Sequence, residues 1–292
     1  MNKSQGLGML LLSLAASIWG GMFVVVKAVV TIIDPITLVW ARYLVALVGL
    51  GLACHWSRLT WHIRRRDWPL LIAIGLIGNT LSIGFQETGT WLTSAQLGAV
   101  VTSATPTFII IFAHLILKER LTGLKIGAVA LATSGVLLIV GVQLTGRQTL
   151  LGAGCLIIAA LTWALMSVLV KKATAYYPPL QVTTIGTAIA TVCLTPIVFS
   201  QPKTLLAIPW FTPQVSLSLL YLGLISTALA FVMWNRGLQL LPASRSGVFF
   251  LLQPLVGSLL GWAFLDEALT PGFVLGTLLI IGSIWLETRF SN

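Results

Sequence analysis

The chain has 292 residues, of which 57% are hydrophobic and only 8% are charged. A single water-soluble core cannot bury that much apolar surface, so the composition excludes an ordinary soluble globular protein and indicates a protein that lies in lipid. The net charge of +10 would favour a nucleic-acid partner in a soluble protein, but the positions of the charges give a different explanation.

Ten apolar stretches follow one another along the chain. A helix of about 20 residues crosses the hydrocarbon core of a bilayer, and each stretch is close to that length. We expect spans at 7–30, 35–53, 68–86, 94–115, 124–142, 151–174, 180–199, 213–235, 243–265 and 272–286. Short connections without a soluble domain join them, so we predict an all-α integral membrane protein with ten transmembrane helices. The first stretch lacks an A-x-A-like cleavage site and is predicted to be a span, not a signal peptide.

The basic residues fall mainly on one side of these spans. With the N-terminus in the cytoplasm, inner segments carry thirteen of the 17 Lys and Arg residues, and outer segments carry Lys27, Arg147 and Lys203. The positive-inside rule therefore predicts a multi-pass protein of the cytoplasmic membrane with both termini cytoplasmic. The basic run 64–66 then marks topology and contacts membrane lipid, and no nucleic acid is needed as a partner.

The chain contains an internal repeat. The stretch "AASIWGGMFVVVK" at 15–27 returns as "AALTWALMSVLVK" at 159–171, an offset of 144 residues, and the later spans align at an offset of 148 residues. The equivalent pairs include Trp19 and Trp163, Lys27 and Lys171, Pro106 and Pro254, and Glu119 and Glu267. The halves 1–146 and 147–292 each hold five spans, and because five is odd, the second half enters the membrane from the opposite face. We therefore predict two inverted five-helix repeats, an architecture found in many secondary transporters.

Three pairs of motifs carry a family resemblance. The pairs "SIWGGMFVVVK" and "LTWALMSVLVK", "SATPTFIII" and "LLQPLVGSL", and "LKERLT" and "LDEALT" resemble the EamA-type family of the drug/metabolite transporter (DMT) superfamily. The resemblance covers essentially the whole chain. It implies a metabolite exporter of the cytoplasmic membrane, in which the fifth and tenth spans lie outside a central cavity that the other eight spans line.

Two of the eleven tryptophans stand apart from the rest. Nine lie near span ends, as an interfacial belt predicts: Trp40, Trp56, Trp61, Trp68, Trp91, Trp210, Trp234, Trp262 and Trp285. Trp19 and Trp163 lie deep in their spans and are repeat equivalents. A buried indole N–H needs a polar partner, which a substrate cavity or a neighbouring helix would supply. Their symmetry favours a substrate-binding role on the pseudo-axis, and simple helix packing is the alternative.

Arg42 is the one basic residue well inside an apolar stretch. A charge at the centre of an inserted helix costs on the order of 2.5 to 3.5 kcal/mol, so a partner must offset it. Arg42 either binds a substrate carboxylate, or it extends outward to helix-end carbonyls beside Asp34.

Other polar and proline positions complete the predicted site. The amides of Asn79, Gln86 and Gln253 are further substrate-binding candidates, since Ser and Thr hydroxyls usually bond to their own helix. Pro106 and Pro254 each fall near the middle of a span, where proline removes a backbone hydrogen bond, and we predict that they are hinges; tolerated kinks are the alternative.

The acidic residues, cysteines and histidines limit the chemistry. All seven acidic residues, Glu87 among them, are expected at or near span ends, so no midplane proton or sodium site is predicted. Glu119 and Glu267 are expected to act as caps or latches at span boundaries. The three cysteines and three histidines show no metal-ligand spacing, and neither a metal nor a cofactor is predicted.

These features predict a secondary transporter that works by alternating access and exports a small amphipathic metabolite, with amino acids or related compounds favoured. Efflux of drugs or toxic small molecules is the first alternative, although a lipophilic cation would need an acidic group deep in the bilayer. A membrane-embedded enzyme is the second, and it would need clustered His, Asp or Glu residues. The predicted partners are the small-molecule substrate and membrane lipid, and the choice between monomer and homodimer stays open.

Overall fold

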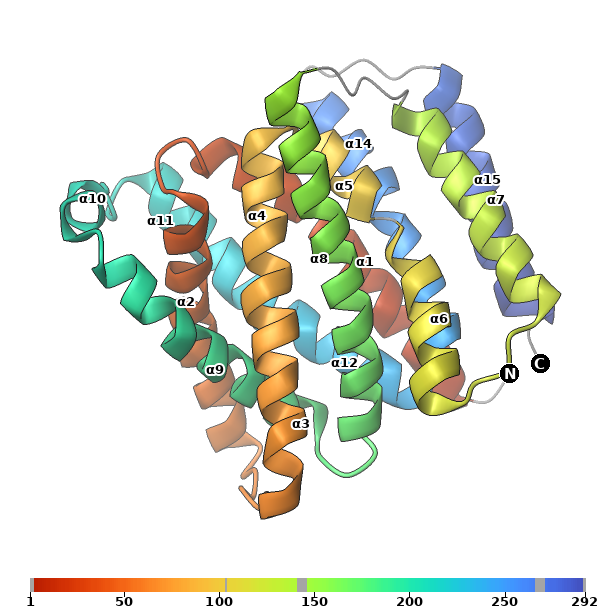
Figure 1. Cartoon of the computed structure of the whole chain (residues 1–292), viewed down its shortest axis with the longest axis horizontal. Coiled ribbons are helices and arrows are strands. Elements are labelled where there is room, and N and C mark those ends of the chain that lie inside the picture. Colours follow the sequence, from red (N-terminus) through yellow and green to blue (C-terminus); the bar gives the residue numbers. More distant parts are fainter. Residues whose placement is uncertain (1–2, 103, 141–145, 266–270, 291–292) are drawn as a thin grey trace.

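The computed structural model describes residues 3–102, 104–140, 146–265 and 271–290, and every regular element in this part of the chain is a helix (Figure 1). Within these described residues, seven helical stretches are long and apolar enough to cross a membrane. They are Lys3–Val29, Pro35–Trp56, Arg65–Leu92, Arg147–Ala173, Pro179–Phe199, Pro213–Leu240 and Ala243–Phe264. The helices Thr105–Leu117 and Val274–Ser283 are apolar but shorter. The predicted all-helical, multi-pass membrane protein is therefore confirmed.

The first half begins with α1 (Lys3–Val29) and α2 (Pro35–Trp56). Asp34 caps α2 by accepting a hydrogen bond from the Thr37 backbone N–H, and Pro35 occupies the first turn, where no backbone donor is lost. The next elements are η1 (Arg65–Asp67), α3 (Trp68–Ala73), η2 (Ile74–Ser82), α4 (Ile83–Leu92), α5 (Ala95–Thr102), α6 (Thr105–Leu117) and α7 (Gly123–Val140).

The second half begins with α8 (Arg147–Ala173) and α9 (Pro179–Phe199), followed by the short α10 (Pro202–Ala207). The remaining elements are α11 (Pro213–Leu220), η3 (Tyr221–Leu229), α12 (Ala230–Leu240), α13 (Ala243–Ser246), η4 (Gly247–Leu251), α14 (Leu252–Leu265) and α15 (Pro271–Phe290). The elements α11, η3 and α12 form one continuous apolar stretch, as η1, α3, η2 and α4 do in the first half.

Each of these two composite stretches contains a π-helical segment of nine residues, η2 and η3. A hydroxyl supports each segment by donating to the carbonyl five residues earlier, Thr80 to Gly75 and Thr227 to Leu222. Such wide turns change which side chains face a neighbour, and they occur frequently at functional sites.

The two halves interlock (Figure 1). Helix α1 packs along α12 and α14 of the second half, while α8 packs along α4 and α6 of the first half. Glycine permits both contacts, because a Cβ atom on Gly20 would lie 2.8 Å from the Gln253 carbonyl, and one on Gly89 would lie 2.9 Å from the Gly152 carbonyl. Helices α7 and α15 pack on each other at one side of the bundle.

The two prolines predicted as hinges lie at different places in their helices. Pro106 is the second residue of α6, in a first turn where proline removes no helical hydrogen bond. Pro254 is the third residue of α14 but lies near the middle of the continuous helical stretch Ala243–Phe264, as the sequence predicts. The expected loss of a helical hydrogen bond is therefore wrong for Pro106 in α6, whereas Pro254 stays a candidate for it. A change of helical geometry precedes Pro254, where the 3-10 segment η4 leads into α14. The hinge role of the two prolines stays a prediction.

Candidate functional site

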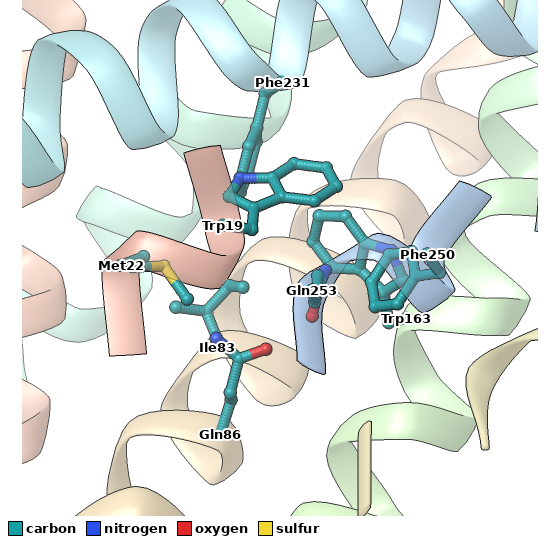
Figure 2. Close-up of a pocket in the computed structure, with 8 residues that line it drawn as sticks. All are labelled: Trp19, Met22, Ile83, Gln86, Trp163, Phe231, Phe250 and Gln253. Atoms are coloured by element: carbon teal, nitrogen blue, oxygen red, sulfur yellow. The ribbon is translucent and has the colours of Figure 1, made fainter. Parts of the chain in front are cut away.

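A small cavity lies among α1, α4, α8, α12, η4 and α14, and so receives side chains from both halves of the chain. Figure 2 shows the lining side chains converging from these separate helices. The lining residues are Trp19, Met22, Ile83, Gln86, Trp163, Phe231, Phe250 and Gln253.

Five aromatic rings form one contiguous cluster around Trp19. The Trp19 ring centroid lies 5.1 Å from that of Trp163, with the two rings nearly perpendicular at 85°. The centroid of Trp234 is 5.2 Å away, and those of Phe231 and Phe250 are both 5.7 Å away. Edge-to-face and tilted contacts at these separations are favourable, so the aromatic part of the wall holds itself in place.

The three indole N–H groups of the cluster differ in their partners. Trp19 Nε1 donates to the Ser226 carbonyl at 2.9 Å. Trp163 Nε1 and Trp234 Nε1 have no acceptor among the described residues, and neither has the Ser167 hydroxyl, one turn after Trp163 on α8. Buried donors normally find acceptors, and in lipid an unpaired one is costly. Trp163, which lines the cavity, therefore presents a buried N–H donor without an acceptor among the described residues.

Four of the six predicted substrate-binding residues line this cavity: Trp19, Trp163, Gln86 and Gln253. Asn79 does not line it. Its side-chain N–H donates to the Thr187 hydroxyl of α9 at 3.3 Å, and its backbone carbonyl accepts a hydrogen bond from the Tyr43 hydroxyl at 2.7 Å. Asn79 thus joins the two halves, and the structure gives it no contact with the cavity.

Arg42 also lies outside the cavity wall, and it does not extend towards Asp34. Its side chain is fully buried, and Nη1 lies 2.5 Å from Glu87 Oε1. Nε donates to the Thr227 hydroxyl at 3.0 Å and Nη2 to the Ser226 hydroxyl at 3.1 Å, both in the π-helical η3. The interpretation of Arg42 as an outward-extending side chain is therefore wrong, because a buried carboxylate compensates its charge.

The expectation that Glu87 marks the end of a span is also wrong. Helix α4 continues to Leu92, and Glu87 is completely buried, with Oε2 unpaired among the described residues. The span continues because Arg42 supplies the opposite charge. The pair adjoins the cavity, since Arg42 Nη2 also contacts the sulfur of Met22 at 3.4 Å, and Gln86 precedes Glu87 in the chain. A buried arginine in a membrane needs an acidic partner, and this requirement could have identified Glu87 from the sequence.

Sequence reasoning missed four lining residues: Met22, Ile83, Phe231 and Phe250. It also placed Trp234 in the interfacial belt, whereas Trp234 is 1% exposed and packs on Trp19, because α12 extends to Leu240. The repeat could have identified two of these lining residues as a pair, because Ile83 and Phe231 are equivalent at the offset of 148 residues and both line the cavity.

Glu119 follows the end of α6 and holds the start of α13. Its two carboxylate oxygens accept hydrogen bonds from the backbone N–H groups of Ala243 at 2.8 Å and Ser244 at 3.1 Å. These are otherwise unpaired donors of a first helical turn, so Glu119 acts as a cap across the two halves. Its repeat equivalent, Glu267, lies outside the described residues.

Comparison with known proteins agrees with this architecture. An uncharacterized transporter from Archaeoglobus fulgidus is 27% identical over 96% of this chain and 96% of its own length. A "Probable amino-acid metabolite efflux pump" from Salmonella typhimurium is 25% identical over 94% of this chain and 92% of its own. A crystal structure with 17% sequence identity superposes with a TM-score of 0.78 over 97% of this chain and 98% of that one, which shows a shared fold.

The profile of the EamA-like transporter family matches residues 6–141 and 150–289, which is nearly the whole chain. The long apolar helices and the cavity between the two halves agree with that match. The chain therefore belongs to the EamA-like transporter family.

Proposed function

We propose that this protein is a secondary transporter that exports a small amphipathic metabolite, with amino acids or related compounds as the favoured class. In this proposal ten helices span the cytoplasmic membrane as two inverted repeats, 1–146 and 147–292, with both termini in the cytoplasm. The substrate binds in the central cavity, which opens alternately to either side. The observation that carries the proposal is the contact of two repeat-equivalent residues, Trp19 and Trp163, at the cavity wall.

Three observations support the repeat. The family profile matches the chain in two segments, one in each half. Each half contains a π-helical segment, and the second lies 147 residues after the first. The packing is also reciprocal, since α1 lies on α12 and α14 while α8 lies on α4 and α6. Such an arrangement lets one half adopt the conformation of the other, which is the basis of alternating access in inverted-repeat carriers.

The cavity chemistry supports a ligand with an apolar part and a hydrogen-bond acceptor. Aromatic side chains are four of the eight residues that line the cavity, and Trp163 Nε1 is a buried donor there without an acceptor among the described residues. A carboxylate or carbonyl oxygen would satisfy that donor, and the amides of Gln86 and Gln253 add further polar contacts.

Efflux of a lipophilic cation has weaker support. Aromatic walls attract cations through their faces, but N–H donors repel them. The buried carboxylate nearest the cavity, that of Glu87, is already paired with Arg42. A membrane-embedded enzyme has no supporting cluster of acidic or histidine side chains among the residues that line the cavity.

The proposal can be tested in proteoliposomes. Purified protein is reconstituted, and the release of radiolabelled amino acids, organic acids and lipophilic cations is followed with and without a pH gradient. Protein-dependent release of a carboxylate-bearing compound, saturable and inhibited by its analogues, would support the proposal. Release of cations alone would favour the drug-efflux alternative, and conversion of any compound to a new product would indicate an enzyme.

A further inference from the structure

Lys27 lies at the end of α1 and binds the end of another helix. Its ammonium donates to the backbone carbonyl of Thr93 at 2.6 Å, of Thr90 at 3.3 Å and of Trp91 at 3.4 Å. Helix α4 ends at Leu92, so these carbonyls belong to its final turn and to the residue beyond it. Carbonyls at a helix end lack intrahelical partners and carry the negative end of the helix dipole, so an ammonium is a favourable partner.

Lys171 makes the corresponding contact in the second half. Its ammonium donates to the carbonyls of Leu241 at 2.7 Å and Gln239 at 3.2 Å, at the end of α12. Lys171 lies near the end of α8, and a second bond, from Gln239 Nε2 to the Thr174 carbonyl at 2.7 Å, joins the same two helix ends.

Two of the three carbonyl contacts of Lys27 have equivalents in the contacts of Lys171. Lys171 follows Lys27 by 144 residues, the offset of the first repeat segment. The carbonyls of Gln239 and Leu241 follow those of Trp91 and Thr93 by 148 residues, the offset of the later spans. The contacts lie at opposite ends of the bundle, because α4 ends at the top of the view in Figure 1, whereas α8 and α12 end towards the bottom.

Each contact also joins two different groups of packed helices. Helix α1 packs mainly with α12 and α14, which we call the α1 group, and α8 packs mainly with α4 and α6, which we call the α8 group. Lys27 extends from the α1 group to α4, and Lys171 extends from the α8 group to α12. The two groups meet at the cavity, where Trp19 of one contacts Trp163 of the other.

We propose that Lys27 and Lys171 are the two gate latches of this transporter, one at each membrane face. The inference rests on the proposed transport function. Opening the cavity to the face where α4 ends requires the Lys27 ammonium to leave the α4 carbonyls, and opening it to the other face requires Lys171 to leave those of α12. Both latches are closed in this structure, which is therefore the occluded state.

The chemistry suits a reversible latch. Each lysine is half-buried, so its ammonium can exchange the helix-end carbonyls for water or lipid headgroups when the two groups separate. A buried ion pair would hold the gate more strongly, because separating it leaves two uncompensated charges. A lysine that serves only its own helix end would bind carbonyls of that helix, whereas these lysines bind another helix in another group.

Cysteine labelling from each side of the membrane tests the latches. Cys54, Cys155 and Cys193 are replaced by Ser, and Ile83→Cys places a reporter at the cavity wall. A membrane-impermeant thiol reagent is applied to one face or the other of oriented vesicles. The variants are Lys27→Met, Lys171→Met and, as a matched control, Met at the exposed neighbour Lys172.

Loss of a latch should favour one open state. Charge-assisted hydrogen bonds are among the stronger ones, so removing a set of them should change the ratio of labelling from the two faces roughly tenfold. Lys27→Met should raise labelling from the face where α4 ends, Lys171→Met should raise it from the opposite face, and Lys172→Met should leave the ratio unchanged. Equal labelling from both faces in both latch variants would overturn the proposal.

Two further measurements separate the possible failures. Lys27→Arg keeps a cation that can donate to the same carbonyls and should restore a ratio near that of the wild type, which a general folding defect would not allow. The amount of monodisperse protein after detergent extraction normalises each variant. If the wild-type protein transports its substrate while neither Met variant changes the ratio, the latches are wrong and the transport function stands. If the ratios change as expected while no compound is transported, the substrate assignment fails instead.

Discussion

The buried pair of Arg42 and Glu87 gives a prediction about stability. Both side chains are fully buried, and Nη1 and Oε1 are 2.5 Å apart. Replacing Glu87 with Ala leaves the guanidinium with three neutral contacts, the hydroxyls of Ser226 and Thr227 and the sulfur of Met22. Because nothing then offsets the positive charge in the membrane, we expect Glu87→Ala to destabilise the folded state strongly.

The size of the effect follows from the burial. Removing one partner of a buried ion pair costs about 3 to 5 kcal/mol, whereas replacing both partners with apolar residues of similar volume is often neutral. We therefore expect a loss of that size for Glu87→Ala and for Arg42→Met alone. The double variant should recover most of it, with a coupling energy of about 2 kcal/mol or more.

The measurement is a double-mutant cycle on unfolding in mixed detergent micelles, followed by tryptophan fluorescence. The surface pair of Arg66 and Asp67 is the matched control, because its atoms are 3.8 Å apart and the Arg66 side chain is 74% exposed. Breaking the surface pair at Arg66 alone, with Asp67 kept because it also accepts a hydrogen bond from the Tyr177 hydroxyl, should cost less than about 1 kcal/mol. The reasoning is refuted if both single variants at Arg42 and Glu87 unfold like the wild type, or if the double variant is as unstable as the sum of the two singles.

Two other predictions concern packing and pH. Gly78→Ala should destabilise the protein by about 1 to 3 kcal/mol, because the new Cβ would lie 2.0 Å from Met166 Cγ. Gly51→Ala is the control, since no atom lies within 4 Å of its new Cβ, and it should be neutral or slightly stabilising in the same unfolding assay. The Tyr177 hydroxyl donates to Asp67 Oδ2 at 2.5 Å, and this hydrogen bond raises the pKa of Tyr177. The stability that this hydrogen bond contributes should be fully present below the ordinary tyrosine pKa of about 10 and lost as the pH rises through the raised pKa. The free energy of unfolding of Tyr177→Phe, measured against pH, should therefore lack this alkaline loss. The same pH profile in the wild type and in Tyr177→Phe would contradict the prediction.

Most of the helical order follows from the sequence, because long apolar runs separated by short charged connections leave little choice in a membrane. The predicted ends of two stretches, Gln86 and Asn235, come too early. Both stretches continue, to Leu92 and Leu240, because partners in other helices satisfy those polar groups. Glu87 bonds to Arg42, and Asn235 donates to the Thr183 hydroxyl at 2.9 Å.

The site was partly predictable for the same reason. Depth and repeat symmetry located Trp19 and Trp163, and both line the cavity. Side-chain direction was not available from the sequence, because the π-helical turns of η2 and η3 shift the faces that a regular helix would present. Asn79, within η2, consequently bonds to α9 instead of lining the cavity.

The most direct test of the central claim, that substrate binds at the cavity wall, is transport by Trp163→Phe. The Trp163 N–H has no acceptor among the described residues, so the change keeps an aromatic ring and removes no hydrogen bond within that part of the protein. Because the smaller ring fills less of this buried, packed position, we expect a modest loss of stability. Since the N–H is assigned to a substrate oxygen, we also expect a loss of transport per folded molecule on the order of tenfold. Trp210→Phe, which removes an indole bond to the Leu205 carbonyl away from the cavity, should transport normally. Wild-type transport by folded Trp163→Phe would contradict the assignment of this cavity as the substrate site.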